Sequence, residues 1–220
     1  MIGVWSERFA RTEYVLICVL ALVLPILEGP KNLAILLLLL TWISHRIVAR
    51  DVALRRPDWV EASLLFILAA CILSTVFNWP LVNGPKGLKD ILVQVFVFWF
   101  LYRAGYSERQ YLVIAAMVVR GVLIGLGWGI LEVAQGQRGQ LQFHSAGIVT
   151  QSSIYLGVVL AVAFSVAWFR LSALSEIHIL RSPITWWLSV VIMLVGLFLM
   201  ASRGAILAVL VTCIIYAVVI

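Results

Sequence analysis

Long runs of apolar residues, separated by short polar segments, recur along nearly the whole chain. A helix that crosses a bilayer needs about 20 mostly apolar residues, within a range of about 17 to 25. The pattern therefore predicts an all-α polytopic membrane protein with about eight transmembrane helices, forming one transmembrane domain over residues 1–220. The predicted spans are residues 14–27, 33–48, 59–77, 88–102, 111–131, 148–169, 184–201 and 204–220.

The last apolar run reaches Ile220 without meeting a polar residue that could carry the chain into water. We therefore expect the chain to be the front part of a larger helical bundle, truncated at its C-terminus.

The basic residues between the spans predict how the chain is oriented. With the N-terminus in the cytoplasm, ten of the 16 Lys and Arg residues fall inside and five outside, and Arg120 lies within a span. Because cytoplasmic loops are enriched in Lys and Arg, this excess predicts a cytoplasmic N-terminus. The inside set is Arg8, Arg11, Arg46, Arg50, Arg55, Arg56, Arg103, Arg109, Arg170 and Arg181, and the outside set is Lys31, Lys86, Lys89, Arg138 and Arg203.

Composition supports a membrane protein and argues against several soluble classes. Hydrophobic residues make up 64% of the chain and charged residues 12%, whereas a soluble domain has about 25% charged residues. The net charge of +6 would favour a nucleic-acid partner in a soluble protein, but here it reflects topology, so we expect membrane lipid and no nucleic acid as partner. His45, His144 and His178 lie in different segments of the chain and form no zinc pattern, so no metal or cofactor is expected.

The predicted outer loop at residues 132–147 is rich in glycine and glutamine and contains Arg138 and His144. Glutamine and arginine side chains are suited to hydrogen bonding with sugar hydroxyls and phosphate oxygens. A solvated connecting loop explains the composition equally well. Lys86, after another outer loop, either adds to an outer basic surface or caps the fourth helix.

A second outer feature is the short turn Ala201-Ser202-Arg203-Gly204-Ala205 between two long apolar runs. A guanidinium at this position, with Gly204 allowing close backbone approach, suits a diphosphate at the membrane surface. An arginine that extends to the lipid headgroups is the alternative.

Arg120 lies near the middle of the fifth predicted span. A charge there costs about 2.5–3.5 kcal/mol on insertion scales, so it requires a partner or a water-filled cavity. An arginine bonded to helix carbonyls is the alternative to a functional role. Gly121, Gly125 and Gly129 recur at every fourth residue, which permits close helix packing.

The segment Ser202-Arg203-Gly204-Ala205, between two apolar runs at the predicted outer face, resembles the signature of the bacterial O-antigen ligase superfamily. That superfamily includes O-antigen ligases, O-antigen polymerases and protein O-oligosaccharyltransferases. Residues 136–157, in which a glycine-rich stretch with an arginine leads into Gln-Ser-Ser-Ile-Tyr-Leu-Gly, resemble its preceding outer segment. The resemblance covers about residues 136–220.

The resemblance implies a metal-independent glycosyltransferase of the bacterial inner membrane with its active face in the periplasm. Its donor is a glycan on undecaprenyl diphosphate, and its acceptor is lipid A-core, another glycan or a protein. Arg138 and Arg203 match the arginines that hold the diphosphate, with Ser202 and Gly204 beside Arg203. The resemblance also implies a general-base histidine in a later outer loop, which His144 does not match, so we expect the catalytic base to be absent from this chain.

The function predicted first is therefore that of an O-antigen ligase in lipopolysaccharide biosynthesis, with an O-antigen or exopolysaccharide polymerase as the alternative within the superfamily. A transporter of lipid-linked saccharide would also explain Arg120 and the many helices, although no internal repeat is visible. A non-catalytic assembly subunit is a third possibility.

Overall fold

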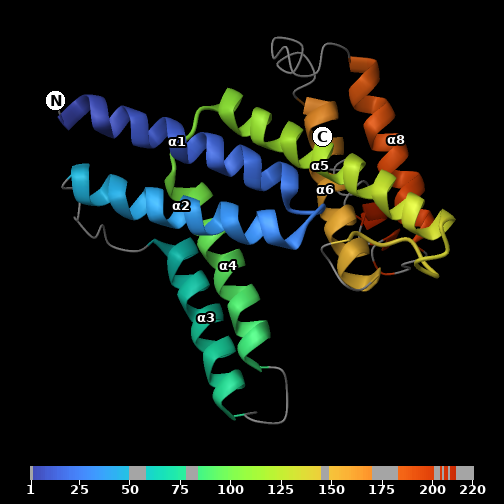
Figure 1. The fold of residues 1–220 in the computed structure, drawn as a ribbon, viewed down its shortest axis with the longest axis horizontal. Coiled ribbons are helices and arrows are strands. Elements are labelled where there is room, and N and C mark those ends of the chain that lie inside the picture. Colours follow the sequence, from blue (N-terminus) through green and yellow to red (C-terminus); the bar gives the residue numbers. More distant parts are fainter. Residues whose placement is uncertain are drawn as a thin grey trace. The chain divides into compact units, whose positions relative to one another are not determined.

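The computed structural model describes residues 2–49, 58–77, 84–144, 149–169, 183–200, 204, 206–207 and 209–211. All the regular secondary structure among these residues is helical (Figure 1). The helices are α1 (Ile2–Val23), α2 (Glu28–Ala49), α3 (Trp59–Phe77), α4 (Gly84–Arg103), α5 (Glu108–Ala134), α6 (Val149–Phe169) and α8 (Pro183–Leu199).

Four helical segments of the described chain are long and apolar enough to cross a membrane, and two others are apolar but shorter. The described part of the chain is thus all-helical with four candidate membrane-spanning helices, as in a membrane protein, while the predicted number of eight spans is not confirmed. The four segments are Glu28–Val48, Trp59–Phe77, Glu108–Ala134 and Gln151–Trp168, and the shorter ones are Ile91–Arg103 and Ile184–Leu199.

The first helix differs most from its predicted bounds. The apolar run at residues 14–27 predicted a short span, whereas α1 begins at Ile2 and ends at Val23. The part of α1 that precedes the predicted span, residues 2–13, contains two acidic and two basic residues, which the hydropathy pattern assigned to a polar segment. Residues 24–26 form a turn, and α2 follows from Glu28. Residues 212–220, most of the predicted eighth span, lie outside the described residues.

The chain forms two compact units. The first comprises residues 1–49 and 108–220, where α5 contacts α1, α6 and α8 while α1 also packs along α2. The core of this unit centres on α5, α6 and α8 and includes Val122, Leu156 and Met193, which are fully buried. Its helices are therefore organised around α5. This helix leads into the loop at residues 135–144, called here the glutamine-rich loop.

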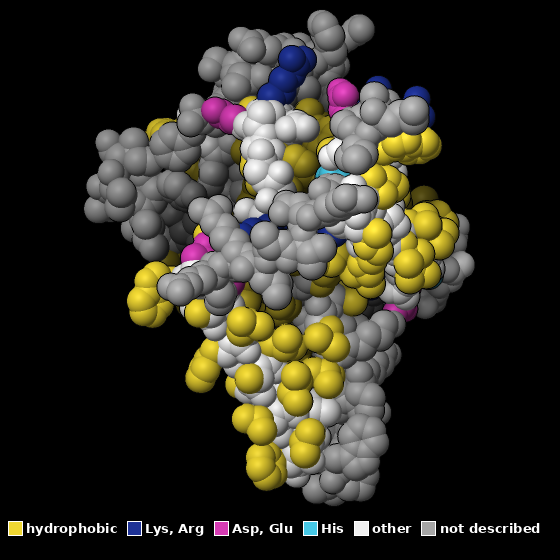
Figure 2. Space-filling view, turned by 90° about the vertical axis from the view of Figure 1, so that its left-hand side faces the viewer, with side chains coloured by type: hydrophobic (Ala, Val, Ile, Leu, Met, Phe, Trp, Pro, Cys, Tyr) yellow, Lys and Arg dark blue, Asp and Glu magenta, His cyan; other side chains and the backbone are white. Residues whose placement is uncertain are grey.

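The second unit, residues 50–107, contains the α3–α4 hairpin. Hydrophobic side chains gather on the face of this hairpin that Figure 2 shows, and Phe66 and Phe77 are among the most exposed. Because Trp59–Phe77 is long and apolar enough to span a bilayer, this surface is suited to contact with lipid.

Candidate functional site

The centre of the candidate site is Glu132, in the last turn of α5, whose side chain is only 9% exposed. Its Oε1 accepts hydrogen bonds from Trp128 Nε1 at 3.0 Å and from His144 Nδ1 at 2.7 Å. Its Oε2 forms an ion pair with Arg138 Nε at 2.8 Å. One buried carboxylate therefore holds two of the predicted site residues, Arg138 and His144, together.

The loop turns back toward Glu132 because of the way α5 ends. Gly136 has a φ of 71°, in the left-handed region that glycine adopts at little cost. The Gln137 amide donates to the Glu132 carbonyl at 2.9 Å, and the Gly136 amide donates to the Val133 carbonyl at 3.0 Å. These two bonds form a Schellman motif, which satisfies the last helix carbonyls and redirects the chain.

Two glycines of α5 allow the returning loop to lie directly against the helix. A Cβ at Gly129 would stand 2.6 Å from the Gln142 carbonyl oxygen, and one at Gly125 would stand 3.0 Å from the Phe143 ring. Phe143 is buried, and its amide donates to Ser152 Oγ at 2.9 Å. The loop is thereby fixed to both α5 and α6 immediately before His144.

His144 combines a fixed orientation with access to solvent, since its side chain is 42% exposed. Its Nδ1 lies between the Glu132 carboxylate and Arg138 Nη2, which is 3.4 Å away. Because the guanidinium can only donate, the carboxylate is the acceptor for an Nδ1 proton, and Nε2 is left as the second polar atom of the ring. The Trp128 ring packs edge-on at 6.1 Å between centroids.

The second predicted element, Ser202 with Arg203, lies outside the described residues. Gly204 is helical and exposed, and a Cβ there would have no neighbour within 4 Å. Met200 and Val209, on either side of this segment in the sequence, belong to the same buried core as Phe143 of the glutamine-rich loop.

The remaining predicted site residues are Arg120, on α5, and Lys86, on α4. Arg120 is partly buried in the middle of α5 and has an interaction partner. Its neighbour Gly121 confirms the predicted close packing, because a Cβ there would collide with the Leu22 carbonyl. Lys86 belongs to α4, but its side chain lies outside the description.

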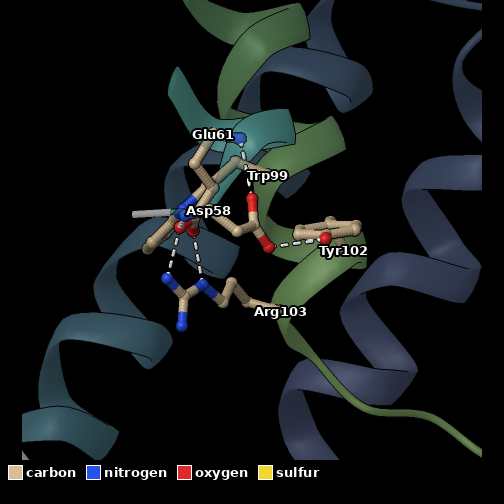
Figure 3. Close-up of polar contacts among 5 residues, drawn as sticks. All are labelled: Asp58, Glu61, Trp99, Tyr102 and Arg103. Carbon is tan, nitrogen blue, oxygen red and sulfur yellow. Dashed lines mark hydrogen bonds and ion pairs between the residues drawn. The ribbon is translucent and has the colours of Figure 1, made fainter. Parts of the chain in front are cut away.

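A polar network at the start of α3 was not predicted from the sequence (Figure 3). Glu61 is buried, and it accepts both Arg103 guanidinium hydrogen bonds and a 2.8 Å bond from Trp99 Nε1. Tyr102 donates to Asp58 Oδ2 at 2.6 Å, and that hydrogen bond is the main reason why the pKa of Asp58 lies below its usual value. The network joins α3 to α4. The feature of the sequence that could have indicated it is the spacing Asp58-x-x-Glu61, which is a variant of the capping box at a helix N-terminus.

A second unpredicted cluster joins α1 to α2. His45 Nδ1 lies 2.9 Å from Glu13 Oε1, and His45 Nε2 lies 3.1 Å from Ser6 Oγ. Phe9 stacks on the imidazole with ring centroids 6.0 Å apart. His45 therefore links two packed helices.

Among the described residues, no group of three or more His, Cys, Asp or Glu side chains is arranged to bind a metal ion. No family model, curated protein or solved structure matches the chain.

Proposed function

We propose that the chain belongs to a glycan transferase that takes its saccharide from an undecaprenyl diphosphate carrier at the periplasmic face of the bacterial inner membrane. The reaction we favour is that of an O-antigen ligase, which joins the glycan to lipid A-core. The observation that carries this proposal is the ion pair that fixes Arg138 to Glu132 beside His144 at the end of α5. It agrees with the resemblance of the segments around Arg138 and Arg203 to the O-antigen ligase superfamily.

The guanidinium of Arg138 retains hydrogen-bonding capacity for an anion. Its Nε faces Glu132, whereas Nη1 is buried and has no hydrogen-bond partner among the described residues. Leaving a buried donor unsatisfied costs about 1–3 kcal/mol, and more for a charged group. A phosphate oxygen would satisfy this donor once the guanidinium turns to expose it, and would then form the strong charge-assisted bond that arginine favours.

The charge balance supports a role for a second cation. Glu132 cancels the charge of Arg138 within the cluster, so Arg138 alone provides little net attraction for a diphosphate. Arg203 is the candidate for the second cation, because residues flanking it share a buried core with Phe143. Two arginines facing the diphosphate would stabilise the charge that develops on this leaving group without a metal.

A saccharide transporter remains the second candidate function, on the single observation that Arg120 lies within the membrane-spanning helix α5. Ionisable residues at such positions mark substrate pathways in transporters. A polymerase would use the same donor site as a ligase, and the two differ only in the acceptor.

The proposal is tested by measuring glycan transfer in membranes that contain the full-length glycan transferase to which the chain is proposed to belong, with Arg138→Gln, Arg203→Gln and the control Arg109→Gln. Arg109 is an exposed arginine at the opposite end of α5. Removal of one donor to a developing anion typically lowers the rate by about 100- to 1,000-fold. We expect that loss for Arg138→Gln and Arg203→Gln, with Arg109→Gln near wild type. Wild-type transfer by both site variants would refute the proposal.

A further inference from the structure

The imidazole of His144 and the guanidinium of Arg138 are unusually close for two side chains that carry or can carry positive charge. Arg138 Nη2 lies 3.4 Å from His144 Nδ1, and both side chains face the same carboxylate, Glu132. With its proton donated to Glu132, Nδ1 cannot also accept from the guanidinium. The contact therefore places two donors side by side, and one carboxylate holds both groups.

The short distance between His144 and Arg138 argues against a role for His144 as the group that acts on the acceptor. In a displacement with inversion at a sugar carbon, the acceptor and the leaving group lie on opposite faces. In inverting glycosidases, the carboxyl group that activates the attacking water and the one that protonates the leaving group are about 6.5–9.5 Å apart. Two side chains in direct contact, as His144 and Arg138 are, could instead bind one anion together.

We infer that His144 is a second ligand of the diphosphate and that the site takes up a proton on His144 when the anion binds. The inference rests on the proposed function and adds to it a proton-linked step in donor binding. Imidazole titrates near neutral pH, so it can supply this charge under physiological conditions. With His144 protonated, the cluster changes from neutral to a net charge of about +1, which favours an anionic ligand.

Glu132 is the residue that makes this proton uptake feasible. The side chains around His144 in the described structure are Glu132 and Trp128 from α5 and Arg138 from the loop. Of these, only Glu132 carries negative charge, and it is bonded to Nδ1. A diphosphate bound against both groups adds negative charge, which a second cation beside Arg138 would balance.

The inference is tested by measuring how tightly the full chain in nanodiscs binds a diphosphate diester, N-acetylglucosamine diphosphate farnesyl ester, at pH 6 and pH 8. This diester has no proton of its own that titrates in that range. We expect wild-type binding to be about tenfold tighter at pH 6, within the range of typical coupling between sites. His144→Gln should bind equally weakly at both pH values, and His144→Lys equally tightly at both.

Trp128→Phe serves as the matched control, since it removes one hydrogen bond to Glu132 and leaves the three charged or titratable groups in place. It should retain the pH dependence. Wild-type affinity that is the same at both pH values, or a pH dependence that persists in His144→Gln, would overturn the inference. If binding is independent of pH but lost in Arg138→Gln, the inference fails and the proposed function stands. If the wild-type chain does not bind the diester at all, the proposed function fails.

Discussion

Glu132 and His144 are twelve residues apart in the sequence, yet the imidazole Nδ1 lies 2.7 Å from the carboxylate Oε1. The contact exists because the chain leaves α5 through a left-handed glycine, passes along the helix it has just left, and is held there by a hydrogen bond to α6. The contact is part of an ordered cluster that brings together the Glu132 carboxylate, the Arg138 guanidinium and the His144 imidazole.

The close approach of the loop to α5 predicts opposite effects for alanine at two neighbouring glycines. Gly129→Ala places a Cβ 2.6 Å from the Gln142 carbonyl oxygen, and we expect a loss of about 1–3 kcal/mol of stability from overpacking. Gly127→Ala meets no atom within 4 Å, and alanine is the better helix former by about 1 kcal/mol. Thermal unfolding in detergent should therefore show a lower Tm for Gly129→Ala and an equal or higher Tm for Gly127→Ala. Equal Tm values for the two variants would contradict the packing described.

The Schellman motif predicts a similar contrast within the loop. Gly136 has a φ of 71°, so Gly136→Ala introduces a left-handed alanine at a cost of about 1–2 kcal/mol. Gly139 is the control, because it has no left-handed φ and no neighbour within 4 Å of an added Cβ. Amide hydrogen exchange over residues 135–144 should become faster in Gly136→Ala and stay unchanged in Gly139→Ala. Unchanged amide exchange in both variants would mean that the Schellman motif does not determine the conformation of the loop.

The hydrogen bond from Tyr102 to Asp58 predicts how the α3–α4 hairpin responds to acid. The folded state lowers the pKa of Asp58 below its usual value of 3.8, chiefly through this bond. A group with a lowered folded-state pKa contributes stability that is complete above its unfolded pKa and is lost as the pH falls through the folded value. Tyr102→Phe should therefore lower the hairpin's stability near pH 7 and narrow its difference from wild type below about pH 3.

The acid response is measured by thermal unfolding between pH 7 and pH 2.5, with Tyr111→Phe as the control tyrosine on α5. A deficit in Tyr102→Phe that stays constant across this pH range would show that Asp58 is not the group involved.

Hydropathy predicted most of the helical architecture, because a bilayer requires long apolar segments whatever their partners. The helix α3, for example, has the predicted bounds of residues 59–77. The charged part of α1 at residues 2–13 was missed, since local hydropathy does not record the contact of Glu13 with a neighbouring helix. Gly125 and Gly129 predicted close packing correctly, but not that a returning loop would be one of the partners.

The site was predictable only in part, for a related reason. Arg138 was selected because arginine suits phosphate and sugar ligands and because it matches a position of the resemblance, and His144 because it lies in the same loop. The role of Glu132 depends on the turn at Gly136, and no periodicity places a helix-terminal carboxylate against residues 6 and 12 positions later. The Asp58–Glu61 spacing carried a readable capping signal, yet the Arg103 and Trp99 partners of Glu61 required the helix pairing itself.

The most direct test of a diphosphate site at this cluster is photocrosslinking in intact membranes with a polyprenyl diphosphate glycan that carries a diazirine beside the diphosphate. The account predicts that the label maps to residues 135–144 and is lost in Arg138→Gln but retained in Arg109→Gln. Labelling confined to α3 or α4, or labelling of residues 135–144 that does not respond to Arg138→Gln, would contradict it.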